Sequence, residues 1–241
     1  HTCRNLRFLG CPGQAEGCLS EWLVMPETSC FPLAPSMTLQ QGALSEPLAI
    51  GLYAVRLADL APGAAIGILG LGPIGLSVLL SARALGADNI YGTDKIDARL
   101  AVAQRAGTRW TGNPDRDDVV AQINAAEPGQ LDVVFDCCGE QDALDQAVEI
   151  LKPGGTLMLI GIPTVDRVSF VIDRLRRKEL RIQNVRRQND CAQAALDLIA
   201  NGRVDADIMA THHFRFEDAP AAFELVSEYR DGVVKAMVEF E

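Results

Sequence analysis

The sequence predicts an α/β protein built on a doubly wound parallel sheet of six strands. Two observations lead to this prediction. Strand-like and helical apolar patterns alternate between residues 64 and 184, which is the order of a parallel sheet with helical crossovers. The strand segments are also almost continuously apolar, as at 157–160, which suits burial on both faces of a sheet.

The alternation places each element in order along the chain. Strands are expected at 64–69, 89–93, 109–110, 131–136, 154–161 and 179–184, with helices between them at 73–86, 96–107, 116–126, 141–151 and 169–177. A helix is expected ahead of them at 39–58, and behind them a helix at 190–201, a segment at 210–216, a helix at 217–228 and a strand at 233–240.

The first 38 residues do not continue the alternation. They predict turns and short strands at 17–25 and 30–33, and they indicate the tail of another domain whose beginning lies outside the sequence.

Further along, Pro153-Gly154-Gly155 predicts the turn into the fifth strand.

A glycine-rich turn joins the first strand to its helix. Gly70, Gly72 and Gly75 have the spacing Gly-x-Gly-x-x-Gly, which permits a tight turn, a close approach of the backbone to a pyrophosphate and close packing of the helix on its strand. The start of the helix offers N–H groups and the positive end of its dipole to phosphate. The pattern therefore predicts a Rossmann-type dinucleotide site, and the alternative is a glycine turn without a ligand.

Asp94 ends the second strand, close to the expected twenty residues after the glycines. A carboxylate there accepts hydrogen bonds from a ribose 2′-OH and repels a 2′-phosphate, which favours NAD over NADP. The alternative is that Asp94 caps the next helix.

The composition narrows the classes of partner. The 241 residues carry a net charge of −10, which disfavours nucleic acid and anionic membranes as partners. No apolar run has transmembrane length and no signal peptide is visible. Seven irregularly spaced cysteines predict a reduced, cytoplasmic protein.

One basic run is interpreted as a solvated helix end and strand edge, with contact to a cofactor or anionic substrate as the alternative: Arg174, Arg176, Arg177, Lys178, Arg181, Arg186 and Arg187.

Several motifs spread over the chain resemble the zinc-containing medium-chain dehydrogenases, and most closely their polyol (sorbitol-type) and threonine dehydrogenase branches. These motifs lie at 42–49 (GALSEPLA), 70–75 (GLGPIG), 136–139 (DCCG), 151–155 (LKPGG), 160–162 (IGI) and 211–216. The resemblance implies a GroES-like β-rich catalytic domain whose chain enters the Rossmann domain and returns at the C-terminus. It divides the chain into a catalytic-domain remnant at 1–50, an NAD-binding Rossmann domain at 51–190 and a returning helix and strand at 191–241.

The same resemblance implies a catalytic zinc whose other ligands, a Cys and a His-Glu pair, lie outside this chain. Glu46 matches a family glutamate that binds this zinc directly or through water, and its alternative role is a helix cap or an ion pair. Zinc would lower the pKa of a substrate alcohol. Cys3 falls where the family places the last cysteine of its structural zinc lobe.

The resemblance also implies roles at the cofactor. Leu71, Pro73 and Ile74 would lie beside the pyrophosphate. Arg99 matches a position that touches the adenosine ribose, with a surface ion pair to Asp97 or Asp94 as the alternative.

Residues that end later strands would border the rest of the cofactor. Cys138 would line the adenine or nicotinamide path as a packing residue. Gly161 and Ile162 would border the nicotinamide. Arg186 would lie near the nicotinamide and the substrate, whereas Arg187 departs from the tyrosine of sorbitol-type relatives.

Together these features predict an enzyme that oxidises a secondary alcohol, a polyol or sugar alcohol, with NAD and with zinc in the intact protein. The alternatives are a non-catalytic NAD(H)-binding module and a zinc-independent reductase, and Glu46-Pro47 argues against the reductase. The exposed edge strand at 179–184 predicts a homodimer or homotetramer. His212 and His213 are expected to be structural, because neighbours in a strand point to opposite faces.

Overall fold

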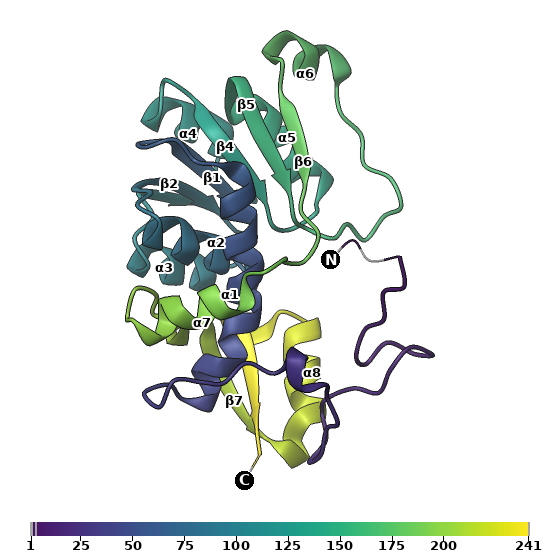
Figure 1. Ribbon diagram of the computed structural model, residues 1–241. Helices are drawn as coiled ribbons and strands as arrows, with labels where there is room; N and C mark the ends of the chain where they lie inside the picture. Colours follow the sequence, from purple (N-terminus) through teal and green to yellow (C-terminus); the bar gives the residue numbers. More distant parts are fainter. Residues whose placement is uncertain (1, 3, 241) are drawn as a thin grey trace.

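A computed structural model describes residue 2 and residues 4–240 (Figure 1). Its centre is a six-stranded sheet with the order β3-β2-β1-β4-β5-β6, in which every neighbouring pair is parallel. The strands are β1 (Ala65–Leu69), β2 (Asn89–Thr93), β3 (Trp110–Gly112), β4 (Leu131–Asp136), β5 (Leu151–Leu159) and β6 (Arg181–Asn184). The predicted fold class is confirmed.

Helices cover both faces of the sheet. One face carries α1 (Leu39–Ala58), α2 (Pro73–Ala84), α3 (Asp97–Arg105) and α7 (Ala192–Ala200), and the other carries α4 (Val119–Ala126) and α5 (Gln141–Ile150). The short helix α6 (Ile172–Lys178) contacts β5. Alternate residues of β1 enter different cores: Ile66 and Ile68 pack under α1 and α2, whereas Ala65 and Leu69 pack on the opposite face.

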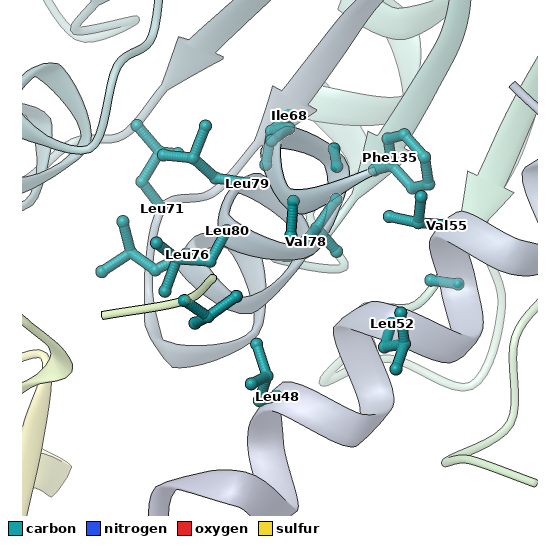
Figure 2. Close-up of a cluster of buried hydrophobic side chains, with 14 of the residues drawn as sticks. Leu48, Leu52, Val55, Ile68, Leu71, Leu76, Val78, Leu79, Leu80 and Phe135 are labelled. Atoms are coloured by element: carbon teal, nitrogen blue, oxygen red, sulfur yellow. The ribbon is translucent and has the colours of Figure 1, made fainter. Parts of the chain in front are cut away.

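The long helix α1 packs against α2 and fills the larger core (Figure 2). It begins with a capping box, in which the Thr38 hydroxyl accepts a hydrogen bond from the Gln41 N–H at 3.1 Å and the Gln41 side chain accepts from the Thr38 N–H at 3.2 Å. Its apolar side buries Leu48, Leu52 and Val55 against α2 and the sheet.

The C-terminal residues form a small separate sheet. Strand β7 (Ala210–Arg215) pairs in parallel with β8 (Lys235–Glu239), and α8 (Ala219–Ser227) connects them. The 3-10 segment η2 (Ala206–Met209) precedes β7, η3 (Phe216–Asp218) lies between β7 and α8, and η4 (Arg230–Gly232) lies between α8 and β8. His212 bonds to Asp231 at 3.2 Å and His213 to Glu239 at 2.7 Å, so the two imidazoles have different partners.

Two local predictions are wrong. Among the described residues ahead of α1, the structure has one 3-10 turn, η1 (Glu27–Ser29), and an isolated bridge between Leu9 and Ala15, but no strand at 17–25 or 30–33. Trp22 and Val24 are 88% and 97% exposed there. Apolar side chains alone do not make a strand, because the backbone N–H and C=O groups also need a neighbouring strand as their partner.

The second error concerns Pro153-Gly154-Gly155, which does not form a turn ahead of the fifth strand. These residues lie inside β5, where the pairing with β4 shifts register. Between the pairs Leu131–Leu151 and Val133–Thr156, β5 has three more residues than β4, and this irregularity accommodates the missing proline N–H and the positive φ of Gly154, which is +76°. Across the described residues, no helix has both the length and the apolar character needed to cross a bilayer.

We expect Gly51→Ala to lower the free energy of unfolding by about 2 kcal/mol, because a Cβ at Gly51 would overlap the Ser77 backbone where α1 crosses α2. Gly42→Ala is the matched control in the same helix. Its Cβ would meet only the flexible Leu33 side chain, so a change of less than about 1 kcal/mol is expected. Urea unfolding of both variants measures the difference, and equal stabilities would contradict the proposed close approach of the helices.

Candidate nucleotide-binding site

The glycine turn has the geometry that its spacing predicts. Gly70 adopts a φ of +92°, and its N–H donates to the Thr93 carbonyl at 2.8 Å, which ties the end of β1 to the end of β2. A Cβ at Gly75 would overlap the Gly70 carbonyl oxygen, so only glycine lets α2 start this close to β1. Gly72 caps α2 and Pro73 is its first residue, so the free N–H groups of this helix start at the turn.

Asp94 lies directly beside this turn. Its carboxylate is buried and accepts the Leu71 N–H at 2.7 Å and the Ile96 N–H at 2.8 Å. Helix α3 starts only at Asp97, so Asp94 is not its N-cap. A carboxylate has about four acceptor positions, so acceptor capacity remains for ribose hydroxyls.

Arg99 is buried rather than a surface residue. Its Nη1 lies 4.0 Å from the Asp94 carboxylate, and its Nε and Nη2 donate to the Val233 carbonyl at 3.0 and 2.7 Å. Of the two alternative ion-pair partners, Asp97 is bound by Arg116 instead, at 2.7 Å. The hydrogen bond from Arg116 is the main cause of a lowered pKa of Asp97.

Three loops at the carboxyl ends of β1, β4 and β5 contact one another. The buried carboxylate of Asp136 accepts the N–H groups of Cys138 at 3.1 Å and Gly139 at 2.9 Å. A Cβ at Gly70 would lie 3.0 Å from the Cys138 Cβ, and one at Gly161 would overlap the Gly139 nitrogen. The strand order reverses between β1 and β4, which is where open α/β sheets bind their ligands.

The two adjacent cysteines at this edge are poor nucleophiles. Burial raises the pKa of Cys137 well above its usual value and raises the pKa of Cys138 to about 12, with the nearby Asp136 carboxylate adding to both shifts. Both thiols therefore stay protonated near neutral pH. This agrees with a packing role for Cys138.

Of the other predicted site residues, Ile162 adjoins this cluster, because a Cβ at Gly139 would come within 2.8 Å of its carbonyl carbon, whereas Glu46 and Arg186 lie on other elements. Glu46 is exposed on α1, and Ile162 is 87% exposed beyond β5. Arg186 follows β6, is exposed and lies 5.7 Å from the Phe8 ring, while the neighbouring Arg187 lies 3.9 Å from the same ring.

The described residues do not contain a complete metal site. Cys3 lies outside them, and among those described there is no group of three or more His, Cys, Asp or Glu side chains that could hold a metal ion. Glu46 is thus the one predicted ligand in this part of the chain, and a single carboxylate does not hold zinc.

Most side chains of the basic run form ion pairs or hydrogen bonds within the protein. Arg174 pairs with Glu149, and Arg176 and Arg177 both pair with Asp173. The Lys178 ammonium donates to three carbonyls at the end of α5, Val148, Glu149 and Leu151.

The sequence reasoning missed two features of the site. One is the role of Asp136, which its position at the end of an apolar strand ahead of Cys-Cys-Gly could have indicated. The other is Lys235, which carries no signal in the sequence. It lines a groove of about 230 Å³ next to the first residue of α2, with Pro73, Ala222, Phe223, Val226, Val234, Ala236 and Val238.

The sheet order, the glycine turn and the acid at the end of β2 define a Rossmann-type dinucleotide-binding protein. A family model described as zinc-binding dehydrogenase matches residues 73–201. The chain belongs to this zinc-binding dehydrogenase family, which confirms the resemblance seen in the sequence.

Curated relatives support the assignment. The chain is 33% identical over 231 residues to L-idonate 5-dehydrogenase of Vitis vinifera, which covers 93% of this chain and 63% of that protein. It is 27% identical over 239 residues to sorbitol dehydrogenase of Bacillus subtilis, covering 99% of this chain and 67% of that protein. The chain thus spans roughly two thirds of the length of these relatives.

Solved structures agree. An oxidoreductase/dehydrogenase of unknown specificity from Escherichia coli superposes with a TM-score of 0.94 and 29% identity, covering 100% of this chain and 69% of the other. A zinc-type protein from Sinorhizobium meliloti, crystallised with NADP, superposes with a TM-score of 0.89 and 29% identity over 98% of this chain and 69% of that one.

We expect iodoacetamide at pH 8 to label the exposed Cys18 in the folded protein and to leave Cys138 unlabelled. With a pKa of about 12, only about one Cys138 thiol in ten thousand is ionised at that pH. Peptide mass spectrometry before and after unfolding in urea measures the labelling. Equal labelling of both cysteines in the folded protein would show that the β4 loop is open to solvent.

Proposed function

We propose that the whole protein oxidises a secondary alcohol of a polyol or sugar alcohol with NAD. When bound, NAD would supply the acceptor for a hydride from the carbinol carbon, and with release of the hydroxyl proton the alcohol would become a ketone. The observation that carries this proposal is the buried Asp94 carboxylate bonded to the glycine turn. Relatives named for idonate and sorbitol support the substrate class.

The choice of NAD rests on charge. Asp94, bonded to the glycine turn, would lie at the adenosine ribose, and its carboxylate would favour a 2′-hydroxyl over a 2′-phosphate. The NADP in the Sinorhizobium meliloti structure means that the other cofactor occurs on this fold, so the preference of this chain depends on its own residues.

Further residues are proposed to complete the cofactor site. The pyrophosphate would lie at the start of α2, near Pro73 and Ile74, and Lys235 at the adjoining groove would offset its charge. Cys138, Gly161 and Ile162 would line the nicotinamide end, and Arg186 would lie at the substrate.

Zinc is proposed for the intact protein, with Glu46 as one ligand or as a partner of its bound water. The remaining ligands would come from outside the described residues, within the catalytic domain of which 1–50 and 191–241 would be parts. When bound, zinc would polarise the substrate oxygen and ease loss of its proton.

The alternative function is a non-catalytic NAD(H)-binding module. The observation that favours it is that Glu46 is the one predicted zinc ligand among the described residues. Zinc content and alcohol oxidation separate the two functions, since the module would bind NADH without either.

Assembly and location follow as proposals. All four residues of the edge strand β6 are exposed, and pairing with a second copy of the strand would form a homodimer or homotetramer. The described cysteines are all free, which supports a reducing compartment such as the cytoplasm.

We expect Asp94→Asn to weaken NADH binding about tenfold, because a charge-assisted hydrogen bond to the ribose is lost. The N–H groups of Leu71 and Ile96 donate to different oxygens of Asp94, so asparagine keeps only one of these two hydrogen bonds, and circular dichroism has to verify that the variant folds. Asp88→Asn, an exposed aspartate at the opposite end of β2, is the control and should leave the affinity unchanged. Fluorescence titration measures both, and an unchanged dissociation constant for Asp94→Asn contradicts the proposed ribose contact.

In the whole protein, Glu46→Ala should lower polyol oxidation by about 10- to 100-fold while leaving NADH affinity unchanged, since it acts on the zinc side of the site. Glu27→Ala, another exposed glutamate, serves as the control. Turnover on a panel of polyols and zinc content by atomic emission are the measurements. Full activity of Glu46→Ala with normal zinc content would rule out its metal role.

A further inference from the structure

The turn between α8 and β8 has an unusual backbone. Tyr229 and Asp231 both adopt a φ of +52°, and Gly232 a φ of +65°. Left-handed backbone is unfavourable for residues other than glycine, and it persists only where surrounding contacts impose it.

Contacts from two sides impose it here. On one side, the His212 Nε2 lies 3.2 Å from the Asp231 carboxylate, and the Thr211 hydroxyl accepts the Val234 N–H at 3.0 Å. On the other side, Gly232 lies against α3, where an added Cβ would come within 2.5 Å of the Ala98 Cβ. The turn is therefore held between β7 and the first turn of α3.

The consequence of this placement is the contact with Arg99. The Val233 carbonyl accepts hydrogen bonds from Nε and Nη2, and the Tyr229 ring lies 5.3 Å from the guanidinium carbon. One edge of the guanidinium is thus occupied. The remaining nitrogen, Nη1, lies 4.0 Å from the Asp94 carboxylate and would be 3.4 Å from a Cβ at Gly72.

We infer that the turn of residues 229–233 is a specificity-determining element, which holds Arg99 so that the ribose site accepts NAD and rejects NADP. This inference rests on the proposed function, because it assigns a role at the same nucleotide site. A freely rotating guanidinium would present a two-nitrogen fork, the geometry that recognises phosphate best. The Val233 carbonyl occupies the Nε/Nη2 edge of the guanidinium. The Nη1 of the other edge lies 4.0 Å from the Asp94 carboxylate, so a 2′-phosphate would have to compete with Asp94 for that edge.

Tyr229 and Gly232 are positioning residues in this scheme, and each offers a matched pair of variants. Gly232→Ala would push the turn away from α3 and withdraw the Val233 carbonyl from Arg99. The double variant Ala98→Gly/Gly232→Ala removes the opposing methyl group, so that only the backbone strain of alanine at a φ of +65° remains. Tyr229 is 63% exposed, so Tyr229→Leu removes the ring with little risk to folding, and Tyr229→Phe retains the ring.

The experiment is fluorescence titration of each variant with NADH and with NADPH, with circular dichroism to verify folding. The readout is the ratio of the NADPH to the NADH dissociation constant, which a loss of folding stability alone would not move. We expect this ratio to fall about tenfold in Gly232→Ala and about threefold in Tyr229→Leu, to return to the wild-type value in Tyr229→Phe, and to lie closer to the wild-type value in the double variant than in Gly232→Ala.

Two results would overturn the inference, and they are distinguishable. If the wild-type chain binds NADH but Gly232→Ala and Tyr229→Leu keep the wild-type ratio, the turn does not set specificity and the proposed function stands. If the wild-type chain binds neither nucleotide, the proposed function and this inference both fail.

Discussion

The nucleotide-binding half of this protein depends on the approach of α2 to the end of β1. No side chain fits at Gly75, because its Cβ position is filled by the Gly70 carbonyl. That approach sets the start of α2 beside the sheet edge and places the Leu71 N–H where the Asp94 carboxylate accepts it. The acid, the turn and the helix start therefore form one unit, and any displacement of α2 would separate all three.

The packing behind α2 keeps it in this place. Helix α1 crosses it where Gly51 meets the Ser77 backbone, and Leu48, Leu52 and Val55 fill the space between the two helices and the sheet (Figure 2). Helix α1 also carries Glu46, the residue proposed to act on zinc. Helix α1 therefore contains both the residues that pack against α2 behind the glycine turn and the residue proposed to act on zinc.

The C-terminal unit contributes to the same region from a distant part of the sequence. Val233 binds Arg99, and Lys235 lines the groove beside Pro73. These contacts connect Val233 to α3 and β8 to the start of α2, so the unit made by β7, α8 and β8 lies directly against the candidate nucleotide site.

The sequence by itself determined the sheet, the glycine turn and the acid that follows it, because alternating apolar periodicity and short-range glycine spacing are local properties of the chain. The sequence could not predict that Arg99 is buried, because the apolar periodicity is equally compatible with an arginine that faces solvent. The hydrogen bond to the Val233 carbonyl, 134 residues away in the sequence, sets its orientation. The sequence also misjudged the segment ahead of α1, because a strand needs a neighbour's backbone and not only apolar side chains. Only the tertiary structure determined which residues distant in sequence come into contact, and which buried donors and acceptors find their hydrogen-bond partners in this way.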